Sequence, residues 1–204
     1  MKERMRLIIM RHGETVENVK GIMQGQLPGK LTKKGIGQAK RLAKRLKDEE
    51  IDYIYSSDLA RATDTTKEIV KFHPKTTVEY VKDLRERNLG EFQGIKKSDI
   101  GWDKSKSVTY AQPKKGETID ELYDRAKKFL YKVLRKHKDD RILIVAHHGI
   151  NSAIICVIKK KRPEDIQKVE TFKNSSITIF EIDEEKNYKI KVWDCAKHLN
   201  EKKI

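Results

Sequence analysis

The chain has 204 residues, enough for one α/β domain that buries most of its apolar surface in a single core. Its formal charge is +15, from 46 Lys and Arg against 31 Asp and Glu. This charge suits anionic ligands, but the lysines are mixed with acidic residues along the whole chain and no nucleic-acid-binding motif accompanies them. The sequence therefore disfavours nucleic-acid binding as the main function of the protein.

No apolar run approaches 18 residues, and the basic start has neither a secretory apolar core nor a small-residue cleavage site. The two cysteines, Cys156 and Cys195, form no CxxC motif and give no disulfide framework. We therefore expect one cytoplasmic domain over residues 1–204, without a membrane partner. The Lys- and Glu-rich composition is also typical of hyperthermophile surfaces.

Apolar periodicity divides the chain into alternating strands and helices. Strands are predicted at 5–10, 51–57, 77–84, 141–146, 176–182 and 188–193, and helices at 35–50, 59–71, 118–137 and 150–160. Asp58 is a candidate N-cap for the second helix, and Thr118 with Glu121 forms a capping box for the third. The order predicts an α/β fold: a three-layer α/β/α sandwich with a mostly parallel, open sheet. Residues 93–117 are expected to form a small cap insertion.

Ligands in such folds bind beyond the carboxyl ends of the strands. The first strand ends in Arg11 and His12, and Gly13 then allows the backbone to approach a ligand closely. An arginine fork matches phosphate oxygens, and Asn18 can donate a further hydrogen bond. A histidine after a strand is more often structural than catalytic, so this segment alone does not decide the function.

Two further strand ends carry comparable residues. Arg61 lies near the expected N-terminus of a helix, which itself suits anions, although a solvated arginine is the simpler interpretation. His147 ends a wholly apolar strand and is followed by His148. Neighbouring histidines raise the question of a metal, but no further ligand spacing accompanies them, and no metal is expected. Glu86 follows the third strand, as a general acid or as part of a charged loop.

The motifs RHGET, QG, LT..G..QA, SSDLARATDT, LRERNLGEFQG, GET and VAHHG occur in this order over roughly residues 5–150. In this order and spacing the chain resembles the histidine phosphatase superfamily, also called phosphoglycerate-mutase-like. The resemblance implies that His12 is a nucleophile that takes a phosphoryl group and that Glu86 donates a proton to the leaving group. It implies no cofactor. It also implies a phosphate pocket of Arg11, Asn18, Arg61 and His147, with Gln24, Glu117 and His148 at or near its rim.

Such chemistry needs a neutral imidazole at His12. Two nearby guanidiniums disfavour the imidazolium, and one ring nitrogen should be held as a donor, for example to a backbone carbonyl. The chain departs from the family pattern at His148, where glycine is usual, at Asp64, where Gln is common, and at Lys30, where an acidic residue often precedes LT. None of these departures removes a residue with an implied catalytic role.

Phosphatases and mutases share this scaffold. The short cap, the MQGQ stretch and the absence of a longer insert favour a phosphomonoester hydrolase with a small phosphorylated substrate, of narrow or broad specificity. The alternative is a phosphoglycerate mutase dependent on 2,3-bisphosphoglycerate. A third interpretation, an anion-binding module on the same fold, would predict the loss of a catalytic residue, and none is lost. A homodimer through the last strands is possible, since these offer a free sheet edge.

Overall fold

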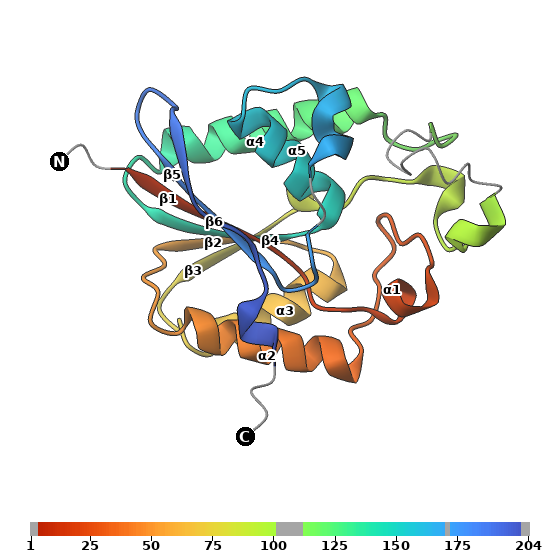
Figure 1. Ribbon diagram of the computed structural model, residues 1–204, viewed down its shortest axis with the longest axis horizontal. Coiled ribbons are helices and arrows are strands. Elements are labelled where there is room, and N and C mark those ends of the chain that lie inside the picture. The colour runs from red at the N-terminus through yellow and green to blue at the C-terminus, as the bar shows by residue number, and fades with distance from the viewer. Residues whose placement is uncertain (1–3, 101–111, 170–171, 201–204) are drawn as a thin grey trace.

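The computed structural model describes residues 4–100, 112–169 and 172–200. Six strands form one sheet in the order β3-β2-β4-β1-β5-β6 (Figure 1). The strands are β1 (Met5–Arg11), β2 (Tyr53–Ser57), β3 (Thr77–Val81), β4 (Arg141–Ala146), β5 (Ile177–Ile182) and β6 (Tyr188–Cys195). Pairing is parallel from β3 to β1, and β5 pairs antiparallel with both β1 and β6. The sheet is therefore mostly parallel, as predicted.

Helices cover both faces of this sheet. α4 (Ile119–Lys136) and α5 (His148–Ile158) lie on one face, and α2 (Lys33–Leu46) and α3 (Ala60–Val70) lie on the other (Figure 1). Each central strand is sandwiched between the two cores: Leu7 and Ile9 of β1 pack toward α4 and α5, while Ile8 and Met10 pack toward α2 and α3. This explains the absence of a polar alternation in β1 and β4, and the three-layer prediction is confirmed.

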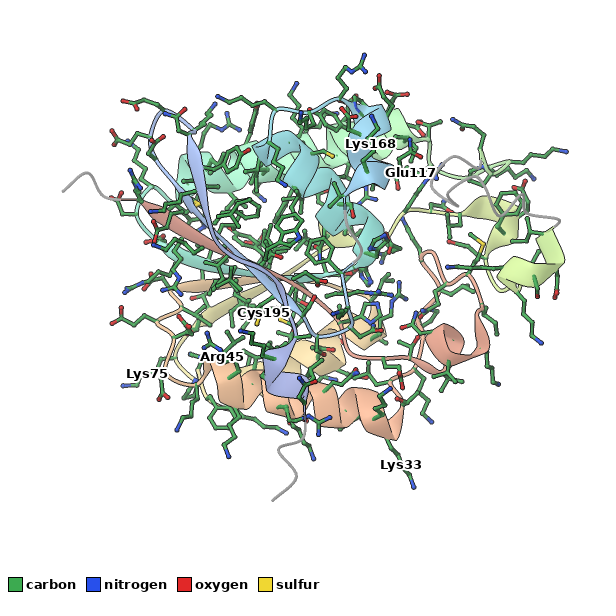
Figure 2. All side chains as sticks on the ribbon, in the orientation of Figure 1. Lys33, Arg45, Lys75, Glu117, Lys168 and Cys195 are labelled. Carbon is green, nitrogen blue, oxygen red and sulfur yellow. The ribbon has the colours of Figure 1, made fainter. Side chains whose placement is uncertain are left out.

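Most helix boundaries follow the local sequence. Thr118 and Glu121 form the predicted capping box at the start of α4. Thr32 caps α2, which begins two residues before and ends four residues before the predicted limits. Lys33 projects from this helix into solvent (Figure 2). None of the helices in the described part of the chain is long and apolar enough to cross a membrane.

The structure differs from the local predictions in three places. Asp58 is not an N-cap: Leu59 precedes α3 without a side-chain cap, because the Asp58 carboxylate instead binds Arg85 through two hydrogen bonds of 2.7 and 2.6 Å. The third strand ends at Val81 and gives way to a 3-10 turn at Lys82–Leu84. A short helix, α1 (Val16–Lys20), follows β1 and was not predicted.

The cap region is described only in part. A 3-10 turn at Gly90–Phe92 precedes the predicted cap at 93–117, and a second lies within it at Lys97–Ile100; residues 101–111 of the predicted cap lie outside the described residues. A two-residue bridge between Ile22 and Lys96 joins the cap to the loop after α1. The cap therefore lies beside the carboxyl ends of the strands. Further 3-10 turns among the described residues are at Pro163–Lys168 and Lys197–Leu199.

Candidate active site

Strand register brings the predicted residues to one edge of the sheet. Arg11 is level with Ala146, and the backbone N–H of His12 donates to Ala146 O at 3.0 Å. Ser56 is level with Val145, so Ser57 lies beside the end of β4. His12, Ser57 and His147 thus meet where three parallel strands end. The cavity at this edge has a volume of about 370 Å³. It is lined by Arg11, His12, Asn18, Ile22, Met23, Gln24, Gly25, Arg61, Glu86, Arg87, Leu89, Lys97, Leu122, His148 and Gly149.

His12 is held as a neutral imidazole with a defined tautomer. Its Nδ1 donates to Gly13 O at 2.7 Å, so Nε2 carries the lone pair. The ring is only 2% exposed. Burial first, and then the charges of Arg61 and Arg11, hold its pKa well below the usual 6.5. The predicted backbone acceptor and the effect of the two guanidiniums are both present, although burial outweighs the charges.

Arg61 is the best-fixed cation of the cavity. It lies in the first turn of α3, and its two terminal nitrogens donate to the carbonyls of Leu27 at 2.5 Å and Gly25 at 2.8 Å. Its Nε is shared between His12 Nε2 at 3.2 Å and His147 Nδ1 at 3.1 Å. Burial lowers the pKa of Arg61 to about 10, so the guanidinium stays charged at neutral pH.

His147 is fully buried and lies behind Arg61 rather than on the cavity wall. Since its Nδ1 accepts from Arg61, the proton resides on Nε2, which donates to Ser57 Oγ at 2.8 Å. Burial and then the Arg61 charge hold its pKa well below 6.5. His147 therefore contacts the site through Arg61 and His12, whose ring centroid is 5.1 Å from that of His147.

Arg11 and Asn18 provide further donors. Arg11 Nη1 donates to Phe172 O at 2.7 Å, whereas its buried Nε has no hydrogen-bond partner within the described residues. The side-chain oxygen of Asn18 accepts from Thr15 N at 3.2 Å and from Asn174 Nδ2 at 3.3 Å. Asn18 lines the cavity, and its amide nitrogen is the donor that this side chain can offer to a bound anion.

Glu86 lies opposite these cations. Its Oε1 accepts from Arg87 N at 2.9 Å, and its Oε2 accepts from Gly149 N at 3.1 Å, in the first turn of α5. The carboxyl group is therefore oriented by two backbone donors from different elements. Its position on the cavity wall agrees with the role of a proton donor to a group leaving from a phosphate bound near His12.

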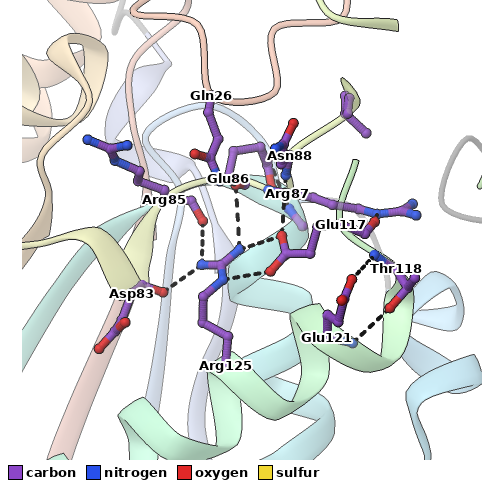
Figure 3. A network of polar contacts seen from close by, with 12 residues as sticks. Gln26, Asp83, Arg85, Glu86, Arg87, Asn88, Glu117, Thr118, Glu121 and Arg125 are labelled. Carbon is purple, nitrogen blue, oxygen red and sulfur yellow. Dashed lines mark hydrogen bonds and ion pairs between the residues drawn. The ribbon is translucent and has the colours of Figure 1, made fainter. Parts of the chain in front are cut away.

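The backbone that carries Glu86 is tied to α4 (Figure 3). Arg125 binds both carboxylate oxygens of Glu117 at 2.7 Å and donates to the carbonyls of Asp83 at 2.7 Å and Arg85 at 2.8 Å. Asn88 N donates to Glu117 Oε2 at 3.2 Å. Glu117 thus lies near Glu86 and close to the cavity, but it is not among the residues that line the cavity.

Gln24 and His148 both line the cavity, as expected. Gln24 Oε1 is buried without a hydrogen-bond partner in the described chain. The ring of His148 packs edge-on against Phe172, with centroids 6.5 Å apart, and burial followed by the Arg11 charge lowers its pKa. His148 and Glu86 thus both form part of the cavity wall.

Several functional neighbours were not predicted. Thr65 Oγ1 accepts from Gly13 N at 3.1 Å, and Ser57 Oγ accepts from His147 Nε2. Both residues belong to the SSDLARATDT motif, but neither was assigned a role of its own. Ser175 N donates to Arg11 O at 3.0 Å, and Asn174 Nδ2 donates to His12 O at 3.1 Å. These two residues precede β5 and carry no local signal, because only the tertiary fold brings them against β1.

Within the ranges that the structure describes, no group of three His, Cys, Asp or Glu side chains is arranged to hold a metal ion. The clustered groups are instead two guanidiniums, two neutral imidazoles, an amide and a carboxyl. This set can bind a phosphate, present a nucleophilic nitrogen and supply a proton.

Comparison with known proteins defines the class. Residues 7–195 match the model of the histidine phosphatase superfamily (branch 1), and the chain belongs to this family.

Two relatives are from Arabidopsis thaliana. The chain is 36% identical to phosphoglycerate mutase-like protein 4, over 96% of this chain and 87% of that protein. It is 32% identical to a metal-independent phosphoserine phosphatase, over 95% of this chain and 83% of that protein. Among solved structures, Bacillus stearothermophilus YhfR superimposes with a TM-score of 0.86 at 27% identity, covering 96% of this chain and all of that one.

Proposed function

We propose that this protein is a metal-independent phosphomonoester hydrolase that acts on small phosphorylated metabolites through a phosphohistidine at His12. The observation that carries the proposal is the state of His12: Nδ1 donates to Gly13 O, burial and two arginines disfavour protonation, and Nε2 faces a cavity lined with phosphate donors. Support comes from the related phosphoserine phosphatase, which is itself named as metal-independent.

In the proposed first step, the His12 Nε2 lone pair forms a bond to phosphorus while the ester P–O bond breaks. The leaving oxygen takes the proton of Glu86. Arg61 Nε contacts the nucleophilic nitrogen, so an incoming phosphate oxygen must take over this donor and free the lone pair. The Arg11 guanidinium and the Asn18 side-chain amide, both from residues that line the cavity, supply further donors to the phosphate oxygens.

In the second step, water attacks phosphorus and gives a proton to the Glu86 carboxylate. The N–P bond breaks, inorganic phosphate leaves, and both side chains return to their initial state. His147 keeps Arg61 Nε directed at the reacting centre throughout, since its own Nε2 is fixed by Ser57. Guanidiniums supply the positive charge that faces the phosphate. Their delocalised charge suits the negative charge that is spread over the oxygens of a phosphoryl transition state.

The test uses purified protein in excess EDTA with p-nitrophenyl phosphate, O-phosphoserine and 3-phosphoglycerate. Phosphate release and 2-phosphoglycerate formation are followed in parallel, and phosphohistidine is trapped by rapid quenching. We expect phosphate release without isomerisation. His12→Ala should lower turnover roughly a thousandfold or more and abolish trapping, whereas the control His73→Ala, remote from the cavity, should retain both. Isomerisation stimulated by 2,3-bisphosphoglycerate would instead identify a mutase.

A further inference from the structure

Glu86 follows β3, the edge strand that pairs with β2 and ends beside it, so it reaches the cavity from the outer side of the sheet. It lies in the segment 82–89, after β3 and a 3-10 turn. A proton donor must lie within hydrogen-bond distance of the leaving oxygen, and a displacement of about 1 Å can lower a rate roughly a hundredfold. The position of this segment therefore controls the acid.

Arg125 holds the segment from below (Figure 3). All three guanidinium nitrogens are engaged, on the two oxygens of Glu117 and on the carbonyls of Asp83 and Arg85 at 2.7 and 2.8 Å. A longer contact of 3.5 Å reaches Glu86 O. The carbonyls of Asp83 and Arg85, which precede Glu86, and more weakly that of Glu86 itself thus converge on one planar, always charged group that is fixed on a helix.

Glu117 holds the other end of this segment, and we call the pair of Arg125 and Glu117 the clamp. Glu117 N donates to Asn88 O at 2.8 Å, and Asn88 N donates to the Glu117 carboxylate at 3.2 Å. Arg87 Nε donates to Glu117 O at 2.7 Å. The side chains of Arg125 and Glu117 are only 19% and 13% exposed, so this bidentate pair is largely shielded from solvent and is more rigid than a surface ion pair.

The same helix also forms part of the cavity. Leu122, one turn before Arg125, is fully buried and lines the wall, and Ala126 is packed in the core between α4 and α5. The clamp therefore fixes the position of Glu86 relative to α4. This helix packs in the core on one side and borders the cavity on the other.

We propose that Arg125, with Glu117, is a positioning residue for the Glu86 general acid: it sets the distance between the carboxyl group and the leaving oxygen and takes no part in phosphate binding. This inference rests on the proposed function, because it assumes that Glu86 protonates the leaving group. It assigns a catalytic consequence to two residues that touch neither the phosphate nor the nucleophile.

The test compares substrates that differ in their need for an acid. O-phosphoserine has a poor alkoxide leaving group, whereas p-nitrophenolate leaves readily without a proton. We expect Arg125→Met to lower kcat for O-phosphoserine roughly tenfold to a hundredfold, with a change of less than about threefold for p-nitrophenyl phosphate and little change in either KM. Arg125→Lys, which keeps the charge and loses the fork, should give an intermediate loss. Arg135→Met, at an exposed arginine of the same helix, is the matched control and should resemble wild type.

A double-mutant cycle separates positioning from a general structural effect. In the Glu86→Gln background, Arg125→Met should cause no further leaving-group-selective loss, because the acid is already absent. If Arg125→Met is too unstable to purify, Arg125→Met with Glu117→Gln removes both partners of the pair and is expected to give the same selectivity.

Equal losses on both substrates, or additive losses in the cycle, would overturn the proposal and leave a purely structural clamp. If Glu86→Gln itself lost both activities equally, the acid assignment would fall, and the clamp proposal with it. Selective loss in Glu86→Gln without selective loss in Arg125→Met would overturn the clamp alone.

Discussion

Acid should destabilise this protein through two buried imidazoles, those of His12 and His147. They are 2% and 0% exposed, and burial followed by the Arg61 charge holds the pKa of both well below 6.5. The unfolded chain protonates them near 6.5, whereas the folded chain keeps them neutral. Between these two pKa values the unfolded state binds more protons, so stability is fully present above about pH 6.5 and is lost as the pH falls toward the folded-state pKa.

The size of the effect follows from proton linkage. Between pH 7.5 and 5.5, each imidazole that stays neutral only in the folded state lowers the free energy of unfolding by about 1.4 kcal/mol. The pair therefore removes about 3 kcal/mol, a large share of the roughly 5–15 kcal/mol that stabilises a typical domain. Carboxylates with a lowered pKa, such as Asp58, are ionised in both states over this range and contribute little.

The assay is urea unfolding at pH 7.5, 6.5 and 5.5 in a phosphate-free buffer, because phosphate bound to the folded site would add its own stabilisation. His12→Asn replaces one of the two imidazoles by a group that does not titrate, and the loss between pH 7.5 and 5.5 should fall by about 1.4 kcal/mol. A free energy of unfolding that is unchanged between these pH values, or a variant with the full wild-type pH dependence, would refute the reasoning.

Three further changes have defined outcomes. In Gly149→Ala the new Cβ would lie 2.5 Å from Glu86 Oε1, so we expect kcat for O-phosphoserine to fall about tenfold or more. The Tm should be unchanged or higher, because Ala favours the helix. An unchanged kcat would contradict this geometry. Thr118→Ala removes the acceptor for Glu121 N and should cost about 1 kcal/mol in urea unfolding, with wild-type activity as the check that the site is intact. His148→Gly widens the cavity beside the leaving group, so kcat/KM for 1-naphthyl phosphate should rise relative to O-phosphoserine, and a constant ratio would show that the ring does not restrict the substrate.

Much of the site could be predicted because parallel strands place their carboxyl ends at one edge. Apolar runs located β1 and β4, and the residues that follow them, His12 and His147, meet once the strands pair. The capping box of α4 was equally readable, since Thr118 and Glu121 interact within four residues. Local sequence is sufficient when a residue's partners are near in the chain or when strand order brings them together.

Other features depend on partners that no local pattern reveals. Aspartate is a preferred N-cap residue, but the bidentate contact of Asp58 with Arg85 is stronger than a single capping hydrogen bond. The Asp58 side chain therefore binds Arg85 and does not cap α3. Arg125 reads as one more charged position on an amphipathic helix, and its partners lie 8 to 42 residues away. The short helix α1 buries no side chain, so it leaves no apolar pattern in the sequence.

The two halves of the proposed chemistry rest on different parts of the scaffold. Phosphate binding and nucleophilic attack depend on the sheet edge, where the guanidinium of Arg61 is satisfied by backbone carbonyls and the imidazole of His12 is kept neutral by burial. Protonation of the leaving group depends on a segment that Arg125 fixes to α4. Within the described residues, no hydrogen bond of Arg125 reaches the phosphate donors, so a change at this segment can alter the position of the acid without disturbing the phosphate site. This separation offers a physical reason why one fold can accept different phosphomonoesters while its phosphate pocket stays the same.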